Sequence, residues 1–149
     1  MKKIEQLYSG EFITMLLFGK EVLVEVFSVD GSYEVEEDEK WFLTEEELDC
    51  LNWFVEHIKI EDYKQEIMKY CNEMYENIGE EPIEEANLEN EISIFAIAVN
   101  TSGIKQSKDG FVYPEISFYG DCKCDEEHGI CIGFRDKKFL GIHGQDWTL

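Results

Sequence analysis

The densest group of chemically reactive side chains lies in a ten-residue stretch, residues 122–131. It holds three thiols and one imidazole, those of Cys122, Cys124, Cys131 and His128. Cysteine sulfur and histidine nitrogen are the usual ligands of structural zinc, which binds four of them in a tetrahedron. Zinc binding is therefore one hypothesis, although such sites usually draw their ligands from two separate turns. The alternative is that these cysteines are small apolar residues buried beside a turn.

Glu127 and His128 suggest a second chemistry, general acid–base catalysis. A carboxylate beside an imidazole can set its tautomer and raise its pKa. Adjacent strand residues point to opposite faces, so the pair requires a turn at this position. The sequence contains no Gly-x-Ser-x-Gly, phosphate-binding loop or His-Glu-x-x-His motif, which would mark a nucleophile, a phosphate site or a metal. It therefore favours a protein without catalytic residues, in which hydrogen bonds hold His128 in a hairpin.

Acidic residues dominate the remaining charge: 34 Asp and Glu face 13 Lys and Arg, a net charge of −21. Residues 34–104 alone carry −17, and no basic residue lies between Lys69 and Lys105. Such a chain repels phosphate backbones and anionic lipids and attracts basic proteins. We therefore expect a basic protein partner, and neither nucleic acid nor a membrane. The candidate partner surface consists of Glu36, Glu37, Asp38, Glu39, Glu45, Glu46, Glu80, Glu81, Glu84 and Glu85.

The strands that must position these residues follow from hydrophobic alternation and from turn residues. Two apolar runs, 12–18 and 21–27, flank Gly19-Lys20, which predicts a hairpin with a type II′ turn. Residues 92–99 are apolar on both faces, which indicates a central strand. Further strands are predicted at 111–119, 130–134 and 139–143.

Two helices are expected between these groups of strands. Thr44-Glu45-Glu46-Glu47 has the pattern of a capping box, which predicts a helix start. A second apolar stripe runs from Tyr63 to Ile78, and Gly79 is placed to end that helix. The pattern leaves open whether residues 57–61 form a turn or a kink. Together the elements predict a single α+β domain over residues 1–149, an antiparallel sheet of about five to six strands with two helices packed on one face.

The cysteine count and the amino-terminal sequence bear on the cellular compartment. Five cysteines are an odd number, which fits free thiols in a reducing compartment better than a disulfide framework. Glu5 and Gln6 interrupt the start before an apolar signal region forms. No apolar run is long enough to cross a bilayer. We therefore expect a cytoplasmic protein.

Three segments of the carboxy-terminal half resemble a family of uncharacterised bacterial domains. They are residues 118–122, residues 125–132 and the closing Gly144-Gln145-Asp146. The family is marked by a strand ending near Cys, an acidic turn with Glu-His-Gly, an apolar strand and a terminal Gly-x-x-Asp. The matching positions here are Glu127, His128, Gly129 and Asp146. The terminal segment departs from the family pattern, because only one residue separates Gly144 from Asp146. The family also often has Trp at the position of Cys124 and a small residue at the position of Cys131. These two thiols would therefore not be family features.

This resemblance implies a function without giving a mechanism. Similar small acidic domains occur beside bacterial polymorphic-toxin genes, which implies an immunity protein that binds and neutralises a toxin. The charge leads independently to the same class, because nuclease toxins are usually basic and complementary fields speed association. The leading hypothesis is thus a non-enzymatic acidic binding protein. The alternative is a small metal-binding or hydrolytic protein centred on residues 122–131.

Overall fold

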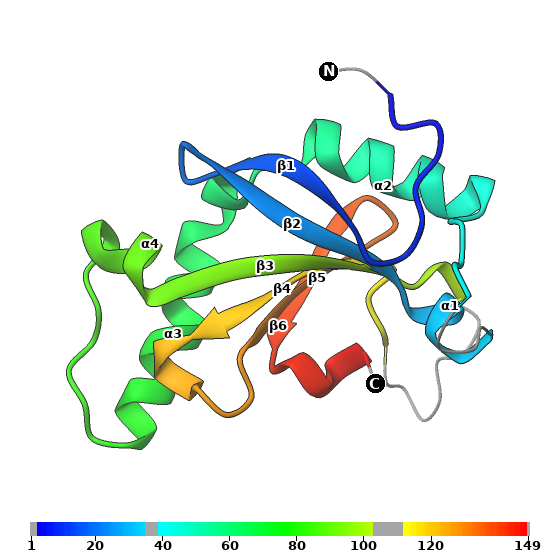
Figure 1. Ribbon diagram of the computed structural model, residues 1–149. Helices are drawn as coiled ribbons and strands as arrows, with labels where there is room; N and C mark the ends of the chain where they lie inside the picture. The colour runs from blue at the N-terminus through cyan, green and yellow to red at the C-terminus, as the bar shows by residue number, and fades with distance from the viewer. Residues whose placement is uncertain (1–2, 35–38, 103–111, 149) are drawn as a thin grey trace.

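One six-stranded sheet organises the chain in the computed structural model, which describes residues 3–34, 39–102 and 112–148 (Figure 1). The strands lie side by side in sequence order. Neighbouring strands are antiparallel except β2 and β3, which are parallel because a long helical connection lies between them. The α+β prediction is confirmed. The strands are β1 (Glu11–Leu17), β2 (Lys20–Ser28), β3 (Ile92–Val99), β4 (Ile116–Cys122), β5 (Ile130–Arg135) and β6 (Lys138–His143).

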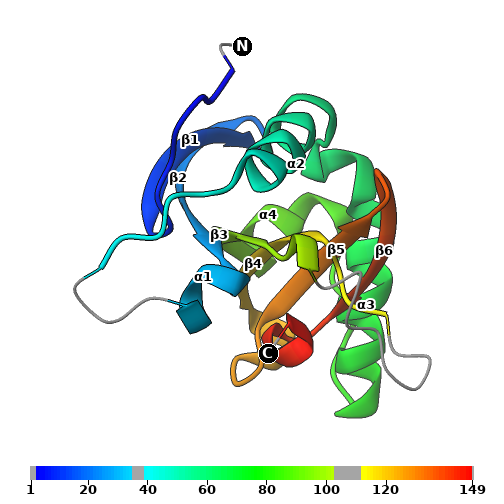
Figure 2. The ribbon, with the colours of Figure 1, turned by 90° about the vertical axis from the view of Figure 1, so that its right-hand side faces the viewer.

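Two longer helices cover one face of this sheet (Figures 1 and 2). They are α2 (Glu45–His57) and α3 (Lys64–Asn77), separated by the 3-10 helix η1 (Ile60–Tyr63), so a break divides them. Among the described residues, no helix is both long and apolar enough to cross a membrane. The shorter helices are α1 (Val29–Glu34), η2 (Glu85–Asn87), α4 (Leu88–Glu91), η4 (Lys123–Asp125) and η5 (Gln145–Thr148).

Both predicted helix boundaries are confirmed by their capping hydrogen bonds. At the start of α2, the Thr44 hydroxyl accepts from the Glu47 backbone N–H, and the Glu47 carboxylate accepts from the Thr44 N–H. At the end of α3, Gly79 has φ +74°, and the Glu80 N–H donates to the Tyr75 carbonyl at 2.8 Å. These bonds satisfy backbone groups that a helix end leaves unpaired.

The first hairpin turns one residue earlier than its sequence predicts. Leu17 pairs with Lys20, so the two turn residues are Phe18 and Gly19. Both have positive φ, 52° and 78°, which is a type I′ rather than a type II′ turn. The Phe18 side chain packs against the main core, and this contact favours the left-handed conformation that a non-glycine residue rarely adopts.

The fourth strand also differs from its predicted range. It begins at Ile116 rather than at residue 111 and continues to Cys122; Phe111 lies outside the described residues. Pro114 precedes the strand, and proline has no backbone N–H for a strand ladder. Because the strand ends later than predicted, Cys122 is the last residue of β4.

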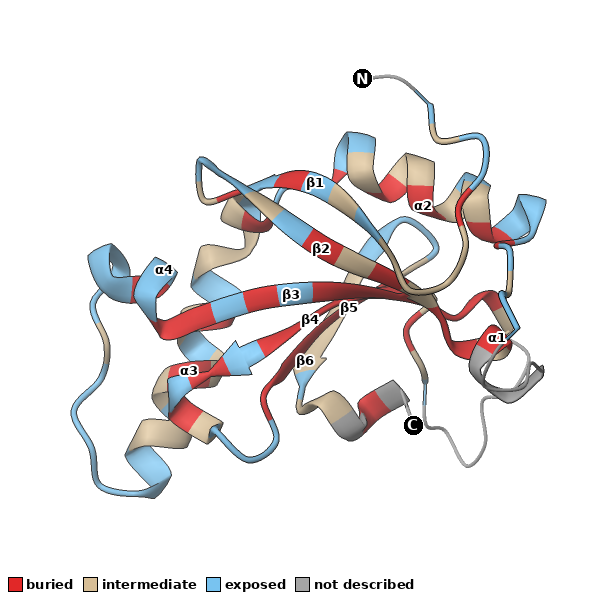
Figure 3. Cartoon of the chain, in the orientation of Figure 1, coloured by how far each residue is buried: buried red, intermediate tan, exposed pale blue. Residues whose placement is uncertain are grey.

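The two faces of the sheet are packed differently. On the helix side, Phe54 of α2 contacts Phe118 of β4 and Phe134 of β5, with ring centroids 4.8 and 5.3 Å apart. On the other side, a smaller cluster including Tyr119 and Trp147 covers part of β3, β4 and β5. The same face of β1 and β2 has exposed apolar side chains, and Figure 3 shows exposed and buried residues alternating along these strands.

Candidate functional site

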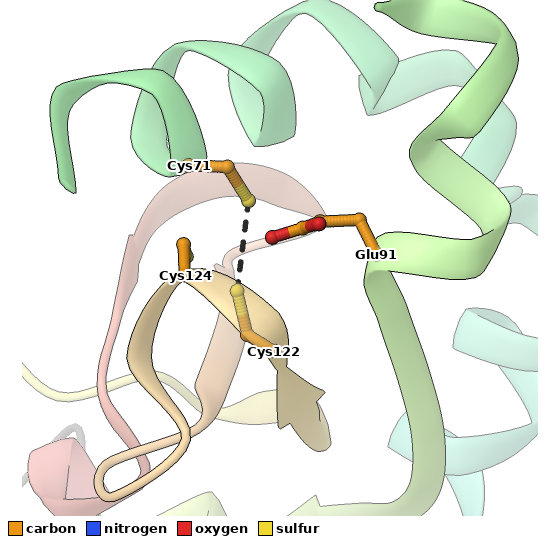
Figure 4. Close-up of side chains that lie close together, drawn as sticks. All are labelled: Cys71, Glu91, Cys122 and Cys124. Atoms are coloured by element: carbon orange, nitrogen blue, oxygen red, sulfur yellow. Dashed lines mark hydrogen bonds between the residues drawn. The ribbon is translucent and has the colours of Figure 1, made fainter. Parts of the chain in front are cut away.

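Four side chains with metal-ligating atoms converge where the helices meet one end of the sheet (Figure 4). Cys71 comes from α3, Glu91 ends α4, Cys122 ends β4 and Cys124 lies in η4. One ligand atom from each residue lies within 4.8 Å of the others. All four residues are buried, with exposed fractions of 0% for Cys71, 6% for Glu91, 1% for Cys122 and 9% for Cys124.

The three thiols interact strongly with one another. The sulfur atoms of Cys71 and Cys122 lie 3.6 Å apart. Hydrogen bonds from Cys124 and Cys71, and from the backbone N–H groups of Cys124 and Asp125, lower the pKa of the Cys122 thiol. The bond to Cys122 correspondingly raises the pKa of Cys71. The cluster is therefore built to stabilise a thiolate at Cys122, the form of cysteine that binds metals.

Two tyrosines of α3 lie beside this group. The Tyr75 hydroxyl donates to Glu91 Oε1 at 2.5 Å and so orients the carboxylate. The Tyr70 hydroxyl oxygen is buried and has no hydrogen-bond partner among the described residues. Burial raises the pKa of Tyr70, and the nearby Cys124 and Cys122 raise it further. Tyr70 is thus a buried donor next to the sulfur atoms, without an acceptor of its own.

The structure brings together only half of the ligand set predicted from residues 122–131. Cys122 and Cys124 belong to the core on the helix side, whereas Cys131 packs with Tyr119 and Trp147 on the opposite face of the sheet. His128 is 55% exposed, and its Nδ1 lies 3.0 Å from Asp125 Oδ2. The structure therefore does not group His128 and Cys131 with Cys122 and Cys124, and β5 places Cys131 on the other face of the sheet.

Sequence reasoning missed Cys71 and Glu91. Cys71 fits the apolar stripe of its helix, and Glu91 stands among many acidic residues. The signal for Glu91 is its place directly before the strand Ile92–Val99, in which Ser93 is the one polar residue.

The Glu-His-Gly turn has a structural task. Gly129 has φ +63°, and a Cβ there would lie 2.1 Å from Gln145 Nε2 and 2.5 Å from the Gly120 carbonyl oxygen. The Gln145 side-chain amide donates to that carbonyl at 2.6 Å, and the Gln145 backbone N–H donates to the His128 carbonyl at 2.8 Å. The turn therefore fastens η5 onto the β4–β5 hairpin. Glu127 is exposed in the same turn, and the side chain of Asp146 lies outside the described part of the chain.

The predicted acidic surface is divided between two ends of the molecule. Glu45 and Glu46 are exposed at the start of α2, whereas the loop after α3 and α4 lie at the opposite end (Figures 1 and 2). Glu39 is exposed before α2, and Glu36, Glu37 and Asp38 lie outside the described residues. At the α4 end, four predicted residues are exposed: Glu80, Glu81, Glu84 and Glu85.

An apolar patch lies on the face of the sheet opposite α2 and α3. By strand pairing, Phe12 and Leu16 of β1 share this face with Leu23 of β2, and their exposed fractions are 56%, 64% and 64%. Phe95, at the bulge of β3, is 42% exposed. A shallow hollow joins the β1–β2 hairpin to α4 and is lined by Leu17, Phe18, Lys20, Val22, Glu89, Ile92, Ser93 and Ile94.

Comparison with known proteins identifies the family. A family model described as a domain of unknown function, DUF6985, matches residues 2–149. The expectation of an uncharacterised domain family is thereby confirmed. No curated protein and no solved structure matches the chain. The chain belongs to the DUF6985 family of domains of unknown function.

Proposed function

We propose that this protein is a non-enzymatic binding protein that captures a basic protein, as an immunity protein captures a nuclease-like toxin of bacterial origin. The observation that carries the proposal is the apolar patch of Phe12, Leu16, Leu23 and Phe95, exposed on the face of the sheet opposite α2 and α3. Contiguous exposed apolar side chains with a polar rim are typical of protein–protein interfaces.

Carboxylates border this patch and give it a preference for positive charge. Glu21 and Glu25 pair across the hairpin with Leu16 and Phe12 and therefore share their face. The hollow between the hairpin and α4 is lined by one carboxylate, Glu89, and by one basic residue, Lys20. Among the described residues, no salt bridge neutralises these carboxylates; the ion pair found joins His128 and Asp125. A basic partner would supply the missing counter-charge and would associate faster because of it.

The cysteines bear on the cellular compartment in which the protein acts. No disulfide joins the five cysteines, which all lie in the described part of the chain, and four of them are buried. Free thiols persist where the surroundings are reducing. We therefore place the action of the protein in the cytoplasm, without direct contact with nucleic acid or a membrane.

The direct test is rescue of growth when the chain is coexpressed with a toxin domain encoded beside its gene. Leu16→Glu together with Leu23→Glu should abolish rescue and leave folding intact, because both side chains are already exposed. Unchanged rescue by that double variant would contradict the assignment of the patch.

Association kinetics test the electrostatic part separately. The association rate with the purified toxin should fall roughly tenfold or more from low to physiological ionic strength. Glu81→Lys with Glu85→Lys should slow association strongly. The matched control, Glu45→Lys with Glu46→Lys, changes the same charge at the far end of the molecule and should slow it much less. An association rate indifferent to salt, or equal effects of the two pairs, would contradict the proposed position of the surface.

A further inference from the structure

We propose that Cys71, Cys122, Cys124 and Glu91 bind one zinc ion in a closed, structural site. This assignment is independent of the proposed partner binding. It differs from the site suggested by residues 122–131, because α3 and α4 replace His128 and Cys131 as the source of two ligands.

The spacing of the ligand atoms fits a tetrahedral ion. With zinc–sulfur bonds of about 2.3 Å, two sulfur ligands of a tetrahedron lie about 3.8 Å apart. The sulfur atoms of Cys71 and Cys122 are 3.6 Å apart, and all four ligand atoms fall within 4.8 Å of one another. Small side-chain adjustments would therefore complete the coordination, without movement of the helices or the sheet.

The type and number of the ligands favour zinc. Three sulfurs and one carboxylate oxygen are a donor set that zinc accepts, whereas magnesium and calcium require oxygen ligands. Four protein ligands fill a tetrahedron and leave no position for water or substrate. Binding releases the thiol protons to solvent, with no change in oxidation state. The site is therefore structural rather than catalytic.

Groups around the ligands are placed to support the metal-bound form. Tyr75 donates to Glu91 Oε1 and leaves the other carboxylate oxygen for the metal. No basic residue in the described part of the chain forms a salt bridge with the buried Glu91, so a cation would neutralise it. The buried Tyr70 hydroxyl has no acceptor among these residues, and a metal-bound thiolate would provide one. Such hydrogen bonds orient ligands and tune the metal.

A zinc ion here would also fix both ends of the most acidic segment of the chain. Cys71 and Glu91 stand on either side of residues 72–90, which include seven glutamates and no basic residue. Like charges favour opening of such a segment. Metal bonds at both of its ends would hold it against the sheet.

The test is metal analysis of the full chain, purified under reducing conditions without chelator. We expect one zinc per chain. Cobalt(II), titrated into chelator-treated protein, should show the strong visible absorption of a tetrahedral site and a sulfur-to-cobalt charge-transfer band. Removal of zinc should lower the melting temperature and increase amide exchange within residues 72–90.

Substitutions identify the ligands. Loss of a hydrogen bond that supports a metal ligand weakens metal affinity roughly 10- to 100-fold, and Tyr75→Phe should fall within that range. Cys122→Ser and Cys124→Ser each remove a ligand and should weaken zinc affinity by more than that. Cys50→Ser, a thiol outside the cluster, is the matched control and should leave affinity unchanged. Glu91→Gln retains all thiols, so it tests the carboxylate if a cysteine variant fails to fold.

Three results would overturn the site. One is substoichiometric zinc in the reduced wild-type protein. The second is equal loss of affinity in Cys50→Ser and Cys122→Ser. The third is a Cys71–Cys122 disulfide by mass spectrometry in protein that binds neither zinc nor cobalt after reduction.

Discussion

The sulfur atoms of Cys71 and Cys122 lie 3.6 Å apart, although 51 positions separate the two residues in the chain. The first belongs to α3 and the second ends β4, so their contact joins the helical layer to the sheet. Glu91 and Cys124 meet them at the same point. Any change at this junction therefore acts on a helix, on the acidic segment and on the end of an interior strand together.

The capping box of α2 should contribute measurably to stability. Thr44→Ala should lower the free energy of unfolding by about 1 kcal/mol, the usual cost of a lost helix cap. Glu47→Ala should cost about 3 kcal/mol, because this buried carboxylate also accepts from Trp41 Nε1 and from the Ser28 hydroxyl, and its loss removes both of these hydrogen bonds. Urea denaturation measures both effects. The exposed neighbour Glu46→Ala should change stability by less than about 0.5 kcal/mol; a loss equal to that of Glu47→Ala would refute this account.

The Glu-His-Gly turn should tolerate no side chain at its glycine. Gly79 and Gly129 both have positive φ, but a Cβ at Gly79 meets nothing within 4 Å, whereas one at Gly129 meets Gln145 and Gly120. Gly79→Ala should therefore cost about 1 kcal/mol from backbone strain alone. Gly129→Ala should cost about 2 kcal/mol more, because it overpacks the turn. Thermal and urea unfolding of the two variants provide the comparison, and similar losses would show that η5 is not fastened as described.

The clustering of carboxylates in one segment should make the thermal stability of the protein depend on salt. Self-repulsion destabilises a compact chain, and salt screens it. The melting temperature of the wild-type protein should therefore rise when sodium chloride is added at low ionic strength. Replacing Glu80, Glu81, Glu84 and Glu85 by Gln should raise the melting temperature at low salt and flatten this dependence. Identical salt curves for the two proteins would mean that this segment carries no repulsive energy.

Cys50 should be a slow nucleophile. It is the one half-buried cysteine of five. Burial raises the pKa of its thiol, and Glu115, 3.6 Å away, raises it further. A higher pKa leaves less thiolate at pH 8, so alkylation by iodoacetamide should be slow and should speed up about tenfold per pH unit below that pKa.

The nearby carboxylates separate this effect from simple shielding. Glu115→Gln removes a negative charge, lowers the pKa of Cys50 toward its ordinary value and should accelerate alkylation at pH 8. Asp49→Asn is the matched control, since Asp49 lines the same hollow, whereas the carboxylates that chiefly raise the pKa of Cys50 are Glu115, Glu46 and Glu47. Peptide mapping by mass spectrometry gives the rates. Equal rates in the wild-type protein and in Glu115→Gln would contradict the electrostatic cause.

Local features of the fold follow from local sequence. The capping box at Thr44, the end of α3 at Gly79 and the apolar strand 92–99 depend on hydrogen bonds and alternation within a few residues, and all three are predicted correctly. The turn at Phe18 and the start of β4 are predicted less well. The turn at Phe18 is accompanied by packing of Phe18 against distant core residues, whereas the later start of β4 follows Pro114, which has no backbone N–H for a strand ladder.

The sequence by itself determined the elements, the acidic middle of the chain and the family to which it belongs. The tertiary structure alone decided which reactive residues meet. Cys122 and Cys131 are close in sequence, yet the sheet separates them, because side chains alternate between its two faces. Cys71 and Glu91 are distant from Cys122 in sequence but join it, because the helical connection between two parallel strands packs back onto the sheet. Such convergence depends on long-range packing, which no local pattern of residues encodes.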